Sequence, residues 1–359
     1  MRQKTPDLVR EFMIKIAHLA LIGLLLVGPL AASGDSAAPS VGYRLIELSF
    51  GGSSWGINAS GQVVGDLPLS LGGLSHAFLY SRGPTTDLGT LGGVQSSALG
   101  INNSGQVVGW AATATQDIHA FLYRNGSMID LGTLGGDESI AWGINDGGDV
   151  VGHSFYAGSE DGRAFLYSKG SMIDLGTLGG VVSVARGINN SGSIVGASTT
   201  LNEEPHAFYS MDGSMIDLGT LGGLLSVAYG INNSGQIVGY SLTAQGQLHA
   251  FLDSDGSMRD LGTLGGTRSE AFSVNERGQI VGSSSVAADV AFHGFLYSDG
   301  SMTDLNSLVD ESGAGYLIHT GTSINNAGQI AAQAFNPNGE TRAILLIPRR
   351  GVEKAKPHP

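Results

Sequence analysis

The sequence predicts an all-β fold, a seven-bladed β-propeller of four-stranded blades, on three observations. A set of short motifs recurs with a period of about 43 residues. Each repeat holds four short strand candidates with turn signals between them. The two ends of the chain carry the two halves of one incomplete hairpin. Repeats of this length with four strands are typical of propeller blades.

Three motifs that keep a fixed order define the period. Asp-Leu-Gly or Asp-Leu-Asn occurs six times, at intervals of 43 or 44 residues. Gly-Ile-Asn or its equivalent occurs seven times, and so does an element like Gly-Gln-Val-Val-Gly. The six aspartates are Asp87, Asp130, Asp174, Asp217, Asp260 and Asp304. We therefore expect seven copies of one structural unit.

Tight turns connect the strand candidates within a unit. Asp255-Gly256 is a two-residue hairpin signal. In that hairpin Phe251 would face Asp260, and His249 would be a diagonal neighbour of Asp260 on the same face.

A second turn lies between the Ile-Asn and Val-Val-Gly elements. Asn-Asn-Ser-Gly at 102–105 offers the residues that tolerate the positive φ of such a turn. The link from Val-Val-Gly to the next Ala-Phe differs from unit to unit in sequence and length. We expect that link to be a surface loop.

The chain ends predict how the ring closes. The first unit lacks a His-Ala-Phe strand before it, and the last unit lacks an Asp-Leu-Gly strand after it. Pairing Arg342 to Leu346 with Leu45 to Leu48 would complete the missing hairpin and remove the open sheet edges. Glu47 would then replace the aspartate, with Arg342 as its partner. A β-solenoid of the same repeats is the alternative, but neither end resembles a capping unit.

The amino terminus is typical of an export signal. Basic residues precede a short apolar stretch, and cleavage after Ser33 would leave small residues at Ala31 and Ser33. An uncleaved membrane anchor is the alternative. We expect a secreted or extracellular protein, with the periplasm or the cell surface as other destinations. The predicted segments are a signal peptide (1–33), a flexible leader (34–42), the seven-repeat domain (43–347) and a basic tail (348–359).

Composition restricts the partners. The chain has 18 basic and 31 acidic residues, a net charge of −13, which disfavours binding to nucleic acid. There is no cysteine, so disulfides and thiolate metal sites are excluded. We expect a monomer that makes no membrane contact after signal cleavage.

Five repeated histidines raise the question of a metal or acid–base site. In a ring each would lie in a different blade, and the equivalent positions of two units hold Arg163 and Arg342, which cannot ligate a metal. We therefore expect each histidine to donate to the aspartate of its own hairpin. The histidines are His76, His119, His206, His249 and His293.

No cofactor site is predicted. Asn145 to Asp149 comes nearest to a calcium loop, but the equivalent turns mostly lack carboxylates, so turn chemistry is the better interpretation. The Gly-Thr-Leu-Gly-Gly runs precede neither Gly-Lys-Ser/Thr nor a helix, so they are not phosphate-binding loops. We predict no metal and no cofactor.

Departures from the repeat are the candidate functional residues, because a rigid scaffold leaves its surface loops free to vary. A six-residue insertion between 308 and 321 holds weak catalytic candidates. These are Asp310, Glu311 and His319. The candidate ligand-binding residues are His153, Phe155, Tyr156, Glu160, Asp161, Glu203, Glu204 and Tyr316.

The strings His-Ala-Phe-Leu-Tyr, Asp-Leu-Gly-Thr-Leu-Gly-Gly and Gly-Ile-Asn-Asn-Ser-Gly-Gln-Val-Val-Gly resemble the HAF-type bacterial extracellular repeat family. The resemblance covers residues 43 to about 347. It implies a secreted or surface-associated protein and supplies no activity and no catalytic residues. Arg163 and Arg342 depart from the family histidine, and Gly294 departs from the family alanine. The seventh unit is degenerate.

Two classes of function follow. The first is a non-catalytic protein that binds an extracellular or cell-surface polysaccharide or protein through variable rim loops. The alternative is a polymer-degrading enzyme, a glycosidase or lyase, with carboxylates at the propeller mouth. Near-identical units lack the singular clustered ionisable residues that catalysis uses, so the first class is favoured.

Overall fold

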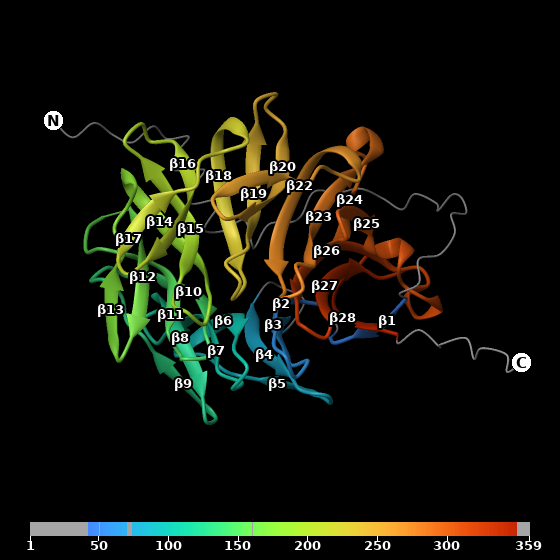
Figure 1. The fold of residues 1–359 in the computed structure, drawn as a ribbon. Helices are drawn as coiled ribbons and strands as arrows, with labels where there is room; N and C mark the ends of the chain where they lie inside the picture. The colour runs from blue at the N-terminus through green and yellow to red at the C-terminus, as the bar shows by residue number, and fades with distance from the viewer. Residues whose placement is uncertain (1–41, 50, 70–73, 160, 350–359) are drawn as a thin grey trace, which may run out of the picture.

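The computed structural model describes residues 42–49, 51–69, 74–159 and 161–349, and within them the fold is all-β (Figure 1). Twenty-eight strands are joined by turns and three short 3-10 helices. The helices are η1 (Ala287–Asp289), η2 (Leu305–Ser307) and η3 (Glu311–Gly313). The predicted signal peptide, the leader before Gly42 and the tail after Arg349 lie outside the described residues.

The strands fall into four classes by their position in the repeat. The first strands are β2 (Ser53–Ile57), β6 (Gly92–Ile101), β10 (Ser139–Ile144), β14 (Gly179–Ile188), β18 (Gly222–Ile231), β22 (Gly265–Val274) and β26 (Leu317–Ile324). The second strands are β3 (Val63–Pro68), β7 (Val107–Thr113), β11 (Val150–Phe155), β15 (Ile194–Thr200), β19 (Ile237–Thr243), β23 (Ile280–Val286) and β27 (Ile330–Phe335). The third strands are β4 (Ser75–Tyr80), β8 (Ile118–Arg124), β12 (Gly162–Ser168), β16 (Pro205–Met211), β20 (Leu248–Ser254), β24 (Phe292–Ser298) and β28 (Thr341–Pro348). The fourth strands are β5 (Thr85–Asp87), β9 (Ser127–Asp130), β13 (Ser171–Asp174), β17 (Ser214–Asp217), β21 (Ser257–Asp260), β25 (Ser301–Asp304) and β1 (Tyr43–Glu47).

Each unit forms a four-stranded antiparallel sheet in the order first, second, third, fourth. The sheets that contain β20 and β24 are joined by one parallel bridge, Leu248 to Arg268. The first strands contact one another in chain order, and β26 contacts β2. The architecture is β-propeller-like. The predicted hairpin register is confirmed, since Phe251 pairs with Asp260.

The last sheet combines the two ends of the chain. Strand β1 pairs antiparallel with β28, Leu45 opposite Leu346, and Figure 1 shows the blue β1 beside the red β28. Arg342 Nε donates to Glu47 Oε1 at 3.0 Å, which is the predicted partnership. Both strands therefore belong to a sheet that neither end of the chain could build alone.

The glycine of Val-Val-Gly lies so close to neighbouring atoms that there is no room for a side chain. A Cβ on Gly239 would lie 1.9 Å from the Val227 carbonyl oxygen and 2.9 Å from the ring of Phe251. Phe251 is fully buried and packs with Ala228 and Val195 of the neighbouring strands. Burial of one phenylalanine in each of six sheets joins neighbouring units into one core.

The sixth and seventh units depart from the repeat sequence, and neighbouring residues compensate for each change in side-chain volume. Ala332 replaces the Val-Val-Gly glycine, and its partner Gly321 replaces the alanine of the other units. Gly294 replaces the family alanine, and a Cβ there would lie 3.0 Å from Leu305 of η2. Leu305 is fully buried, so the missing methyl group makes room for it. Both units keep their four-stranded sheets.

A search of the described ranges for a helix long and apolar enough to span a membrane finds none.

Deletion of residues 342–359 removes the β28 side chains from the last core cluster and exposes the edges of β1 and β27. We expect the shortened chain to lose its cooperative melting transition in circular dichroism, because β1 and β27 would both lose β28 as a partner strand. Deletion of 350–359 alone is the control and should leave the transition in place. A sharp transition at an unchanged temperature in the longer deletion would contradict this role of β28.

Candidate functional site

Seven buried asparagines link the ends of the first strands. Each Nδ2 donates to the backbone carbonyl of the asparagine in the next unit, at 2.9 to 3.3 Å, and Asn325 donates back to Asn58. The chain of bonds is therefore a closed cycle, which we call the asparagine ring. Its members are Asn58, Asn102, Asn145, Asn189, Asn232, Asn275 and Asn325.

The asparagine side-chain oxygen also fixes the turn that follows. Asn102 Oδ1 accepts from the amides of Ser104 and Gln106, at 3.1 and 2.9 Å. Asn145 Oδ1 accepts from the amide of Asp149 in the same way. Turn chemistry thus accounts for the segment that came nearest to a calcium loop.

A second, exposed layer follows the asparagine ring. The residue after each asparagine uses its side-chain oxygen to accept the amide of the equivalent residue in the preceding unit, as Asp146 does for Asn103 at 2.9 Å. Six such bonds occur, and Ala59 interrupts the layer because it has no acceptor. These residues, the asparagine ring and the isoleucines before it line an axial hollow of about 190 Å³. Burial would raise the pKa of Asp146, but hydrogen bonds from Asn103 and Asn190 lower it.

The repeated histidines pair with the repeated aspartates, as the sequence predicts. In five units the Nδ1 atom lies 2.6 to 2.9 Å from a carboxylate oxygen of the aspartate. The histidine side chains keep only 14 to 21% exposure. One histidine lies in each of these units and each has its own carboxylate, so the repeated histidines do not converge on one ion.

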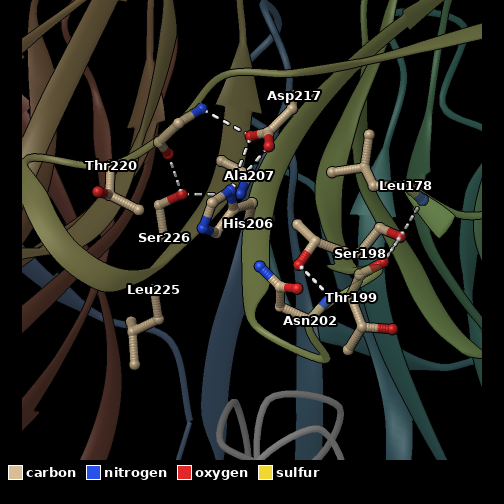
Figure 2. Close-up of polar contacts among 12 residues, drawn as sticks. Leu178, Ser198, Thr199, Asn202, His206, Ala207, Asp217, Thr220, Leu225 and Ser226 are labelled. Atoms are coloured by element: carbon tan, nitrogen blue, oxygen red, sulfur yellow. Dashed lines mark hydrogen bonds and ion pairs between the residues drawn. The ribbon is translucent and has the colours of Figure 1, made fainter. Parts of the chain in front are cut away.

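The histidine–aspartate pair is part of a larger turn network (Figure 2). Asp217 Oδ1 also accepts the amide of Gly219 at 2.7 Å. Ser226, in the next unit, accepts the Ala207 amide at 2.8 Å and donates to the Gly219 carbonyl at 2.5 Å. The network therefore fastens the end of each fourth strand to the start of the next unit.

The two arginine substitutions have different outcomes. Arg342 bonds to Glu47, whose other oxygen accepts from Tyr316. In the third sheet, which has Arg163 at the histidine position, Asp174 accepts from Tyr156 Oη at 2.7 Å. Tyr156 therefore performs the structural task that histidine performs elsewhere, and the carboxylate raises its pKa.

A β-bulge recurs in every first strand, at the residue two before the isoleucine or valine of the repeat. In β14, Ala185 pairs with Gly196 and Gly187 pairs with Val195, which leaves Arg186 unpaired. Bulges redirect a side chain and are frequent beside functional sites. The bulge recurs in every first strand, but the residue type at the bulge differs between units. The bulge residues are Trp55, Leu99, Trp142, Arg186, Tyr229, Phe272 and Thr322.

Four bulge residues and two second-strand residues form a continuous cluster, which we call the aromatic arc. Arg186 stacks over Trp142, with the guanidinium carbon 3.8 Å from the ring centroid, and lies 5.3 Å from that of Tyr229. Trp142 Nε1 donates to His153 Nδ1 at 3.0 Å. Tyr229 contacts two further rings, at centroid distances of 5.7 and 5.2 Å. The arc comprises Trp142, His153, Arg186, Tyr229, Tyr240 and Phe272.

Two buried carboxyl groups lie in different strands, Asp66 in the second strand β3 and Glu270 in the first strand β22. Burial raises the pKa of Asp66, which accepts from Trp55 Nε1 at 2.8 Å and from Ser97 at 3.3 Å. Burial also raises the pKa of Glu270, against an opposing effect of Arg268. Both groups therefore hold a proton to higher pH than an exposed carboxyl group does.

The predicted ligand-binding residues are distributed over several loops. His153 is 1% exposed and lies inside β11, so it is a core residue rather than a loop residue. Phe155 ends β11, and its ring meets that of His153 edge-on at 5.8 Å. Asp161 follows in the same link, and Glu203 and Glu204 lie between β15 and β16. Glu160 lies outside the described residues.

The three catalytic candidates do not form one cluster, because Asp310 and Glu311 share a cation and His319 has different neighbours. Asp310 forms an ion pair with Arg349, and Glu311 lies 3.6 Å from the same guanidinium group. Hydrogen bonds from Ser312 lower the pKa of Asp310. His319 lies in β26 against Phe335, at a ring-centroid distance of 4.7 Å, and burial lowers its pKa to about 4.

The aromatic arc was not among the predicted sites, although the sequence contains its signal. The residue before Gly-Ile-Asn and the residue after Val-Val-Gly change type between units while their neighbours repeat. The sequence alone does not show that these residues, which come from four units, lie in contact. The bulge and the pairing of adjacent strands show it.

No protein-family model matches the chain, and no curated protein matches it. Among solved structures, it is similar to a puromycin-hydrolysing peptidase from Mycobacterium tuberculosis, with a TM-score of 0.57 and 11% identity. That alignment covers 87% of this chain and 54% of the peptidase chain, so this chain spans about half its length. At this identity the likeness concerns the fold alone.

Two weaker similarities are to TolB from Acinetobacter baumannii and to a gluconolactonase from Xanthomonas campestris. The TM-scores are 0.43 and 0.41, each at 11% identity. The alignments cover 87% of this chain and 80% of TolB, and 86% of this chain and 90% of the gluconolactonase.

Asp217→Ala removes the acceptor for both His206 and the Gly219 amide. We expect it to lower the free energy of unfolding by about 1–3 kcal/mol, because these partners lose their hydrogen bonds. Asp137→Ala, at an exposed aspartate, is the control and should change it by less than about 0.5 kcal/mol. Urea titration measures both, and equal effects would contradict a structural role for the pair.

The neutral histidine in β26 predicts a pH dependence of stability. Its pKa of about 4 in the folded protein lies below the ordinary value of 6.5, so the unfolded chain binds the proton first as the pH falls. Stability should therefore decline from about pH 6.5 towards pH 4, by at most about 3 kcal/mol.

His319→Gln should flatten this decline in urea titrations over that range. His76→Gln, at a histidine that faces a carboxylate, should retain it. An unchanged decline in the first variant would show that other groups cause it.

Proposed function

We propose that this protein is a secreted, seven-bladed β-propeller that binds an extracellular polysaccharide without degrading it. The asparagine ring and the pairing of β1 with β28 support a closed ring of seven blades. The proposed ligand lies on the loop face, which we define as the side where second strands lead into third strands and where first strands begin.

The exposed apolar side chains carry this proposal. Of the eleven large apolar residues that are exposed in the described ranges, eight lie on the loop face and three lie on hairpins between third and fourth strands. The eight are Leu69, Leu74, Val94, Tyr156, Leu201, Leu224, Val290 and Phe292, and the three are Ile173, Met211 and Ile216. Apolar side chains concentrated on one face are typical of a binding surface.

Their distribution supports a ligand that itself repeats. Each of the first six sheets contributes at least one of the eight residues. Many equivalent weak contacts gain most from a partner that offers the same group many times, because each later contact is intramolecular. A polysaccharide is such a partner, and its sugar rings can pack against Tyr156 and Phe292.

One observation favours the enzyme alternative. The carboxyl groups of Asp66 and Glu270 have raised pKa values, as a general acid requires. The binding function is preferred because the repeated histidine–aspartate pairs serve as structural contacts at turns. In addition, His319 packs against Phe335, while Asp310 and Glu311 face Arg349.

The test is to incubate the purified chain with insoluble polysaccharides and to follow both depletion of protein and release of soluble sugar. We expect depletion without release. Leu201→Ser, at a side chain that is 82% exposed on the loop face, combined with Phe292→Ser, should weaken binding about tenfold.

Ile173→Ser combined with Ile216→Ser, on the outer hairpins, is the matched control and should bind like the wild type. Released sugar would establish the enzyme alternative and make Asp66 and Glu270 the first residues to substitute. A failure to bind any polysaccharide would exclude the proposed ligand.

A further inference from the structure

Arg186 is a buried cation without an anionic partner. Its residue is 6% exposed, and its Nε and Nη2 atoms have no hydrogen-bond acceptor within the described ranges. Buried polar groups normally have partners, and an uncompensated buried charge is strongly destabilising. The arrangement therefore requires an explanation.

The neighbouring side chains do not neutralise the guanidinium group. Its contacts are the faces of Trp142 and Tyr229, and among the described residues it forms no ion pair. Burial raises the pKa of Tyr229 to about 12 and raises that of Tyr240 well above its ordinary value, so both phenols stay neutral. Ring faces attract a cation, but they cannot accept its in-plane N–H groups.

Packing alone does not require an arginine here. The same bulge position holds Leu99 in the second sheet and Phe272 in the sixth, and both of these sheets keep the bulge. The fold thus accepts an apolar residue at this place. Arg186 in the fourth sheet adds a positive charge and hydrogen-bond donors, and neither is required to form the bulge.

We propose that Arg186 is an anion-binding residue that receives a carboxylate group of an acidic sugar. The guanidinium group presents its donors in a planar fork that matches a carboxylate in two parallel hydrogen bonds. The rings of Trp142 and Tyr229 hold the fork in place, which lowers the entropy lost on binding. This inference rests on the proposed polysaccharide function and specifies its ligand as an acidic polysaccharide. It adds a contact near the end of the first strand β14, away from the loop face where that strand begins.

The direct test is titration of the purified chain with sodium glucuronate, followed by tryptophan fluorescence and calorimetry. Glucose serves as the neutral sugar and sodium acetate as the bare carboxylate. We expect glucuronate to bind more tightly than either control. Trp142 is one of three tryptophans in the chain, and its contact with Arg186 should make its emission respond. Trp142→Phe should remove that response.

Arg186→Met keeps an unbranched side chain of similar length and removes the charge and the donors. We expect glucuronate affinity to fall about tenfold or more, as for a lost charge-assisted hydrogen bond. Arg259→Met is the matched control, since Arg259 also lies over a tyrosine ring and donates to Tyr297, but in another part of the protein. Its affinity should equal that of the wild type.

Stability supplies a second measurement that separates binding from structure. Without ligand, Arg186→Met should melt at the same or a higher temperature than the wild type, because an unpaired buried charge is lost. Glucuronate should raise the melting temperature of the wild type and not that of the variant. A lower melting temperature of the variant without ligand, together with unchanged glucuronate binding, would show that Arg186 is only structural and overturn the inference.

The remaining outcomes distinguish this inference from the proposed function. Acetate binding as tight as that of glucuronate would overturn the assignment to a sugar. If the chain binds neutral polysaccharides and Arg186→Met binds them equally well, the inference fails and the polysaccharide function stands. If the loop-face variants retain polysaccharide binding while Arg186→Met loses it, the inference stands and the loop face is not the binding surface.

Discussion

Seven asparagine side chains hold the inner strands of this protein to one another in a cycle, and the rest of the structure depends on that cycle. Each amide donates to the next unit, while its oxygen fixes the turn that leads from the first strand to the second. A buried hydrogen bond of this kind contributes about 1 kcal/mol, and leaving one partner unsatisfied costs more. The same side chain thus sets both the local turn and the spacing between neighbouring units. A substitution at one asparagine would disturb two units at once.

The outer part of each sheet is fastened separately. Histidine and aspartate hold the third and fourth strands together, and a serine from the following unit joins that turn to the next first strand. Polar side chains placed at both ends of a sheet leave the middle to phenylalanine and valine, which pack across adjacent units. Most of this framework does not involve the loops on one side, which can therefore differ, although Tyr156 of one loop bonds to Asp174.

Much of this fold could be predicted from the sequence because its polar contacts are local or repeated. The pairing of His249 with Asp260 follows from a two-residue turn, and the contact between Glu47 and Arg342 follows from the incomplete hairpins at the two ends. The asparagine ring was not predicted, since its bonds connect residues about 43 positions apart and no spacing within a unit reveals them. The bond from Tyr156 to Asp174 was not predicted either, since Tyr156 lies in a loop whose sequence does not repeat.

The candidate site was harder to predict than the fold. Sequence analysis looked for function in loops and in an insertion, but a bulge in each of β10, β14 and β18, the first strands of three successive units, brings Trp142, Arg186 and Tyr229 together. A bulge adds one unpaired residue, and the repeat length absorbs it in every unit, so the period does not reveal it. The remaining sequence signal for the site is a position in the repeat at which the residue type varies from unit to unit.

The pairing of β1 with β28 also determines where the ends of the folded domain lie. The amide of Arg349 donates to the carbonyl of Gly42 at 2.7 Å, so the first and last described residues are neighbours. Because the first strands contact one another in chain order and β26 contacts β2, the arrangement of the units in space does not depend on which unit comes first in the chain. The ends could be joined by a short linker and the chain opened in any variable loop, and the circularly permuted protein would keep every sheet, the asparagine ring and the aromatic arc. Such a permutation would move the position of the chain ends and leave the arrangement of the sheets unchanged.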